Sequence, residues 1–247
     1  MAVIIFILGL VIGSFLNVVI YRLPKGESIV RPPSHCPECG HRLKPLELVP
    51  IVSYIFLRGK CSNCGIRISV RYPMVELFTA IIFTGNYIMF SDIMNIVAGL
   101  VLSSILIALT MIDYDHQILP DSLTLGGLAI GLIFSFIRPG FNALTGISGI
   151  FAAGGLLFVV ALVSKGGLGG GDIKLMAMTG SFLGPLSAVA AVFLGALIGL
   201  IASLPGIITG KLEMKSKLPF GPFLAIASMI FWFWGDIFWN WYLGLIL

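Results

Sequence analysis

Apolar stretches of about 20 residues recur along almost the whole chain, and they restrict it to folds that a lipid bilayer accepts. An α-helix of that length crosses some 30 Å of hydrocarbon while satisfying its own backbone hydrogen bonds. The 247 residues are 58% hydrophobic and 11% charged, whereas soluble domains are roughly 25% charged. The sequence therefore predicts an all-α polytopic membrane protein.

Charge and length divide the apolar runs into a bundle of about eight transmembrane helices. The first run has no basic residue before it, unlike a secretory signal peptide, so we expect a retained helix with its N-terminus outside. The run at 173–209 exceeds one span, and Gly184-Pro185 offers a break that returns the chain to the cytoplasm, as the positive-inside rule requires. Arg138 is the one charge on the predicted outer side. The other predicted spans are 1–20, 73–90, 93–112, 123–137, 141–163 and 218–247, and the basic return after 173–209 is Lys211, Lys215 and Lys217.

One extended polar segment, 22–71, interrupts the apolar pattern. It carries nine of the fifteen Lys and Arg residues and all four cysteines. We expect a first transmembrane helix over 1–21, a small cytoplasmic domain over 22–72 and a multi-helix transmembrane catalytic domain over 73–247. Because the basic residues are not interleaved with exposed aromatics, the net charge of +4 reflects membrane topology and does not indicate nucleic-acid binding.

The four cysteines form two Cys-x-x-Cys pairs, each followed by glycine. Two such pairs about twenty residues apart present four thiolates to a tetrahedral Zn²⁺. Two disulfides or a redox pair are the alternatives, and a reducing cytoplasm disfavours both. Four thiolates leave no position for water, so we predict a structural zinc and expect His35 and His41 to be solvated loop residues. The predicted ligands are Cys36, Cys39, Cys61 and Cys64.

Two aspartates stand at the edges of apolar runs, Asp113 in MIDYDHQILPD and Asp172 in GGLGGGDIKL. An ionisable side chain there costs free energy unless it has a function or a partner. The predicted topology brings both to the cytoplasmic face, where two carboxyls that share one proton can activate water. This pair predicts an aspartic protease within the membrane, in which either aspartate can start as the base.

Asp115 and Asp121 compete with Asp113 for this role. Asp121 follows Pro120 and suits a helix N-cap, whereas Asp115 lies farther into the polar loop. Asp113 is the closest of the three to hydrocarbon, and we therefore choose it.

The glycines at 166–171 are interpreted as an irregular loop that places Asp172 in a cavity, with a flexible linker as the alternative.

Several motifs together resemble the bacterial type IV prepilin peptidases, a family of GxGD-type membrane aspartic proteases. The resemblance spans nearly the whole chain, and the order of the motifs is as specific as any one of them. The motifs are GSFLNVVIYRLP at 13–24, the two cysteine pairs, RYP at 71–73 with Glu76, the stretch from Asp113 to Pro120-Asp121, and GGGDIK at 169–174.

The resemblance implies a bifunctional, multi-pass enzyme of the bacterial cytoplasmic membrane. Members cleave the basic leader from type IV prepilins, or from related pseudopilins, on the cytoplasmic side. Many then methylate the new N-terminus with S-adenosylmethionine, and only the resemblance implies this cofactor. The catalytic aspartates of the family match Asp113 and Asp172, and its zinc ligands match the four cysteines. The expected partners are prepilin or pseudopilin substrates and the lipid bilayer, without nucleic acid.

Three alternatives explain part of the sequence. A presenilin-like intramembrane protease would share the two aspartates without needing the cysteine pairs. A non-enzymatic membrane scaffold would use the cysteine domain to dock a partner and both aspartates as helix caps. A transporter would use Asp113 and Asp172 as a cation relay.

Overall fold

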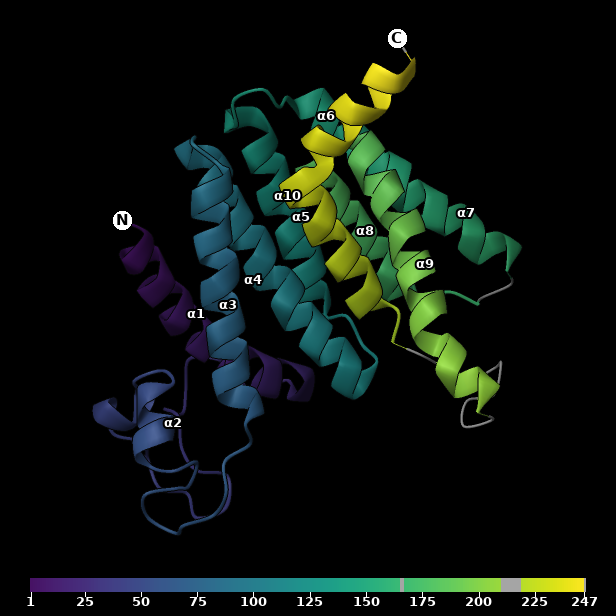
Figure 1. Ribbon diagram of the computed structural model, residues 1–247. Helices are drawn as coiled ribbons and strands as arrows, with labels where there is room; N and C mark the ends of the chain where they lie inside the picture. The colour runs from purple at the N-terminus through teal and green to yellow at the C-terminus, as the bar shows by residue number, and fades with distance from the viewer. Residues whose placement is uncertain (165–166, 210–218, 247) are drawn as a thin grey trace. The chain divides into compact units, whose positions relative to one another are not determined.

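The structure, a computed structural model, describes residues 1–164, 167–209 and 219–246 (Figure 1). Within these residues the chain is helical, and the only strand-like pairings are two isolated antiparallel bridges. The all-α prediction is confirmed. The predicted basic return at Lys211, Lys215 and Lys217 lies outside the described residues.

The chain divides into two compact units, Met1–Ser91 and Asp92–Leu247. The first holds α1, α2 and α3 with two short 3-10 turns. The second holds α4 to α10 with one π-helical turn. The domain boundaries predicted after residues 21 and 72 stay a prediction. The first compact unit extends past both positions because α3 packs on α1. The elements of the first unit are α1 (Ala2–Arg22), η1 (Leu23–Lys25), η2 (Pro45–Leu48), α2 (Val52–Phe56) and α3 (Arg71–Met89).

Small residues bring α1 and α3 together. A Cβ built on Gly9 would lie 2.5 Å from the Cα of Ala80, and one built on Gly13 would lie 2.7 Å from the Cα of Glu76. Two glycines four residues apart let helix backbones approach closely where lipid provides no hydrophobic driving force. The glycine that opens the GSFLNVVIYRLP motif is therefore part of a helix-packing interface.

The second unit is arranged around α8, which packs against α5, α6, η3, α9 and α10 (Figure 1). Leu175, Met176, Met178 and Phe182 on α8 are fully buried. The predicted break at Gly184-Pro185 is confirmed, because α8 ends before it and α9 begins at the proline. The elements are α4 (Ile93–His116), α5 (Asp121–Ile137), α6 (Ala143–Gly149), η3 (Ile150–Gly154), α7 (Gly155–Val163), α8 (Gly170–Leu183), α9 (Pro185–Ile208) and α10 (Gly221–Ile246).

The predicted number of about eight transmembrane helices is too high when helices are judged by their length and apolar composition. Within the described residues five stretches are long and apolar enough to cross a membrane. Helix α8 has 14 residues and α5 has 17, which at 1.5 Å per residue gives about 21 Å and 26 Å, less than the hydrocarbon thickness. The five candidate spans are Ala2–Lys25, Ile93–His116, Ala143–Val163, Pro185–Gly206 and Gly221–Leu245.

Arg138, the charge that the predicted topology left on the outer side, is held by partners from three helices. Its guanidinium donates to the Asn95 side-chain oxygen and to the Phe182 carbonyl, both at 2.8 Å. The same group lies over the rings of Phe141 and Trp232, 4.6 and 4.7 Å from their centroids. Its charge is therefore stabilised inside the second unit, where Arg138 links the start of α4 and the end of α8 to α10.

Candidate functional site

Asp113 lies in the last turn of α4 and is 6% exposed. Its Oδ2 accepts a 3.0 Å hydrogen bond from the backbone N–H of Gly221, the first residue of α10. Helix α4 ends three residues later, where Gln117 adopts a left-handed conformation and its N–H donates to the Asp113 carbonyl. The carboxyl is thus fixed at the boundary between a long apolar helix and a turn.

Asp172 lies in the first turn of α8 and is partly buried. Its backbone N–H donates to the Gly169 carbonyl at 3.1 Å. Helix α4 contacts α8, so the end of α4, which carries Asp113, and the start of α8, which carries Asp172, belong to the same packed unit. The shared catalytic role of the two aspartates stays a prediction.

Glycines and one leucine shape the space around the two carboxyls. A Cβ at Gly169 would lie 3.3 Å from Oδ2 of Asp172, and a Cβ at Gly221 would lie 2.8 Å from Oδ2 of Asp113. Leu119 packs against both Gly171 and Gly221. The leucine therefore joins the two segments that carry the aspartates, and the glycines let backbone approach the carboxyls closely.

The predicted irregular glycine loop is only partly present. Helix α8 begins at Gly170, with Gly169 as an extended N-cap. Asp172 is therefore placed by the first helical turn and not by a loop. Regular backbone is the more rigid support for a functional side chain.

The competing aspartates have other positions. Asp115 is exposed in the last turn of α4. Asp121 is not the N-cap of α5, which is Pro120, but the first helical residue. Its carboxylate accepts a 2.6 Å hydrogen bond from Lys174, so the predicted capping oxygen instead forms an ion pair between α5 and α8. Of the three, Asp113 alone is buried.

Two contributors escaped prediction from the sequence. Gly221 is 108 positions from Asp113, and its only local signal is a glycine followed by Pro222 at the start of an apolar run. Leu119 is one apolar residue among many. Neither carries a chemical group that would mark it.

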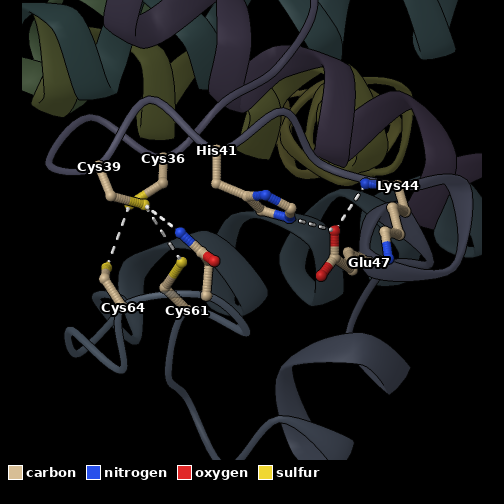
Figure 2. A network of polar contacts seen from close by, with 8 residues as sticks. Cys36, Cys39, His41, Lys44, Glu47, Cys61 and Cys64 are labelled. Atoms are coloured by element: carbon tan, nitrogen blue, oxygen red, sulfur yellow. Dashed lines mark hydrogen bonds and ion pairs between the residues drawn. The ribbon is translucent and has the colours of Figure 1, made fainter.

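The four cysteines converge as predicted (Figure 2). Their sulfur atoms lie within 4.8 Å of one another, and the Cys36–Cys64 and Cys39–Cys61 pairs are 3.9 and 4.0 Å apart. A tetrahedron with Zn–S bonds of about 2.3 Å has sulfur–sulfur edges of about 3.8 Å. All four cysteines are free. The donor set therefore fits a four-thiolate zinc site.

The two cysteine pairs have the same backbone geometry. In each, the glycine after the second cysteine has a φ near +70° and donates its N–H to the carbonyl of the first cysteine at 3.0 Å. An antiparallel bridge closes each turn, His35 with Arg42 and Lys60 with Arg67. Glycine is needed at both turns because only it adopts this φ without strain.

Hydrogen bonds at Cys39 favour its thiolate form. The His41 backbone and the Asn63 side-chain amide lower the pKa of the Cys39 thiol to about 6, and the Asn63 amide lies 3.6 Å from the Cys39 sulfur. The thiolate is the form that binds zinc.

The two histidines near the first pair have partners other than a metal. His35 is exposed, with its Nδ1 3.0 Å from the Pro33 carbonyl. His41 is partly buried and lies 3.3 Å from the Glu47 carboxylate, which also accepts the Lys44 backbone N–H (Figure 2). His41 therefore stabilises the loop through its contact with Glu47. It is less exposed to solvent than predicted.

Two family models match the chain. The Bacterial Peptidase A24 N-terminal domain matches residues 7–90, and the Type IV leader peptidase family matches residues 100–204. The matched ranges fall in the first and second compact units, respectively. No solved structure matches the chain.

Curated relatives match over nearly the full length. Proteins named prepilin leader peptidase/N-methyltransferase are 37% identical in Bacillus subtilis, 36% in Aeromonas hydrophila and 38% in Pseudomonas aeruginosa. The alignments cover 99%, 97% and 93% of this chain and 98%, 92% and 89% of the respective relatives. A protease family argues against the scaffold and transporter alternatives. The chain belongs to the type IV leader peptidase family and is a peptidase.

Proposed function

We propose that this protein cleaves the leader peptide from type IV prepilins or pseudopilins and then methylates the new N-terminus with S-adenosylmethionine. The observation that supports the peptidase step is that Leu119 packs against Gly171, the residue before Asp172, and against Gly221, whose N–H binds the Asp113 carboxyl. The relatives, named prepilin leader peptidase/N-methyltransferase, support the substrate class and the methyl transfer.

The two aspartates act as acid and base in peptide hydrolysis. The ionised carboxylate takes a proton from water, which attacks the scissile carbonyl, while the protonated carboxyl donates to the carbonyl oxygen. The proton taken from water then passes to the leaving amine as the C–N bond breaks. The Gly221 N–H holds one oxygen of Asp113 and fixes the orientation of that carboxyl. Either aspartate can start as the base.

The reaction takes place at the cytoplasmic face of the bacterial inner membrane. Asp113 and Asp172 lie at helix ends, where a peptide cut beside its apolar segment can reach them. The basic segment 22–71 favours a cytoplasmic position for the polar domain. A zinc ion held by the four cysteines would stabilise that domain and would take no part in hydrolysis, because four thiolates would leave no coordination position for water.

Intact-mass analysis of a prepilin incubated with the purified protein tests this proposal. With S-adenosylmethionine present, the product should lose its leader and gain one methyl group at the new N-terminus. Without the cofactor, cleavage should continue and the methyl group should be absent. A prepilin that keeps its leader under both conditions would refute the peptidase function, and a cleaved product that stays unmethylated would refute the second step.

A further inference from the structure

The first compact unit contains a pocket of about 460 Å³, within the range of roughly 300–1,000 Å³ that is typical of small-molecule sites. Its walls come from the end of α1, the start of α3 and both cysteine turns. All of its lining residues fall between Ser14 and Glu76. It is therefore a feature of the first unit alone, apart from Asp113 and Asp172.

Charge is distributed unevenly around this pocket. The first unit carries nine Lys and Arg residues and four carboxylates. All four carboxylates line the pocket, whereas only two of the nine basic residues do. The carboxylates are Glu27, Glu38, Glu47 and Glu76, and the two basic residues are Arg22 and Arg67. A basic unit that gathers its acids around one cavity favours a cationic ligand there.

Arg22 does little to neutralise the negative charge that these carboxylates present to a ligand. It is buried, and its guanidinium donates to the carbonyls of Ser28, Pro32 and Pro33 at 3.0, 2.7 and 3.4 Å. Those bonds tie the chain after α1 back onto the helix. The donors of Arg22 are therefore committed to the wall of the pocket.

Glu76 is the most enclosed of the four carboxylates at 8% exposure. Its Oε2 accepts the backbone N–H of Ile51 at 2.8 Å, and the Ser14 hydroxyl is hydrogen-bonded to the same carboxylate. These contacts hold the carboxylate in one orientation on the pocket wall. Ile51 has a φ of 60°, which is strained for a β-branched residue, and strain of this kind clusters at ligand sites.

Three tyrosines complete the wall, Tyr21, Tyr54 and Tyr72. The ammonium group of Lys25 already lies 3.4 Å from the centroid of the Tyr21 ring, so an aromatic face here accepts a cation. Tyr54 is held by a hydrogen bond of 3.2 Å to the Ile68 carbonyl. Aromatic faces beside carboxylates suit a ligand that combines positive charge with a flat ring.

We propose that this pocket binds S-adenosylmethionine, whose sulfonium and ammonium groups supply positive charge and whose adenine supplies the ring. The inference rests on the proposed methyl transfer and locates its cofactor. When bound, the cofactor supplies a methyl group: a C–N bond forms at the attacking amine, the C–S bond breaks with its electron pair left on sulfur, and the amine releases a proton. Glu76 is assigned as a residue that recognises the charge of the cofactor.

Binding of the cofactor and of its neutral-sulfur product tests this assignment independently of catalysis. Equilibrium dialysis of the full-length protein in detergent, with labelled S-adenosylmethionine and with S-adenosylhomocysteine, gives the affinity ratio of the two. S-adenosylmethionine carries one more positive charge, so any carboxylate in the pocket favours it through the Coulomb energy. Glu76→Gln should lower that ratio by about tenfold, because a buried carboxylate is poorly screened.

Glu38→Gln and Asp115→Asn complete the design. Glu38 is an exposed lining residue, so its replacement should not affect folding and should lower the ratio less, by about threefold. Asp115 is an exposed carboxylate of the second unit, and its replacement should leave the ratio unchanged. Zinc content and melting temperature report whether each variant is folded.

The outcomes separate the pocket from the proposed function. A wild-type protein that binds the cofactor and methylates, with the ratio unchanged in folded Glu76→Gln and Glu38→Gln, would overturn the pocket assignment and leave methyl transfer intact. A wild-type protein that cleaves but neither binds nor methylates would overturn both. Displacement of the cofactor by a synthetic basic leader peptide, with Glu76→Gln weakening only the peptide, would assign the pocket to the substrate leader instead.

Discussion

The backbone N–H of Gly221 donates a 3.0 Å hydrogen bond to Oδ2 of Asp113. The bond joins the start of α10 to the end of α4 within the second unit. The donor belongs to the main chain. Glycine is needed at position 221 because it has no side chain that would crowd the Asp113 carboxyl. A Cβ there would lie 2.8 Å from the same oxygen, closer than an ordinary van der Waals contact.

Replacing Gly221 with alanine should reduce cleavage. The added methyl would push the Asp113 carboxyl from its position, and misplacement of a catalytic group by about 1 Å can cost on the order of 100-fold in rate. The control is Gly244→Ala on the same helix, where a Cβ meets no atom within 4 Å. Single-turnover cleavage of a prepilin measures both variants. Equal rates would show that the position of the Asp113 carboxyl does not depend on this glycine.

Replacing Gly180 with alanine should destabilise the second unit. A Cβ at this position would overlap the Gly149 backbone carbonyl, where α8 meets the end of α6. Overpacking of this kind costs about 1–3 kcal/mol. Gly155→Ala is the control, because its Cβ would enter open space in a helix, where alanine is favoured by up to about 1 kcal/mol.

Thermal unfolding in detergent measures this pair of variants. Gly180→Ala should melt at a lower temperature than the wild type, and Gly155→Ala at the same or a higher one. An unchanged melting temperature for Gly180→Ala would mean that the two helices separate at little cost.

The purified protein should hold about one Zn²⁺ per chain, and Cys36→Ser should weaken or abolish zinc binding, because a tetrahedral structural site rarely tolerates the loss of a ligand. His35→Ala should keep the metal, since His35 contacts the Pro33 carbonyl and lies outside the four-sulfur cluster. Elemental analysis gives the zinc content. Limited proteolysis should show cleavage of the segment 22–71 once zinc is lost. An active preparation without zinc would contradict the structural role.

The helical elements could be predicted from the sequence because each apolar run carries its own boundary signals. Gly184-Pro185 marked the break between α8 and α9, and the glycine after each cysteine pair marked a turn. These signals are local, so they need no knowledge of the fold. The number of membrane spans was harder to predict. A helix as short as α8 is apolar because it packs against neighbouring helices, so its composition does not show whether it crosses the membrane.

The candidate site could be proposed from the sequence where a residue carries an unusual chemical group, but not where a residue contributes only through its position in the fold. Asp113, Asp172 and the cysteines stand out because charge or thiol groups are unusual in their setting. Gly221 does not stand out, because its backbone N–H reaches Asp113 only after α10 has packed against α4. Arg138 seemed misplaced in the sequence for the same reason, since its partners come from distant helices.

Cleavage by Asp113→Asn and Asp172→Asn tests the central claim most directly, with Asp115→Asn as the matched control. If both carboxyls act as acid and base, each of the first two variants should lose prepilin cleavage by several orders of magnitude, on the order of the 10⁴-fold loss seen when a catalytic carboxylate is replaced. Both should stay folded, with zinc bound, and Asp115→Asn should cleave at nearly the wild-type rate. Substantial turnover by either Asp113→Asn or Asp172→Asn would contradict the account.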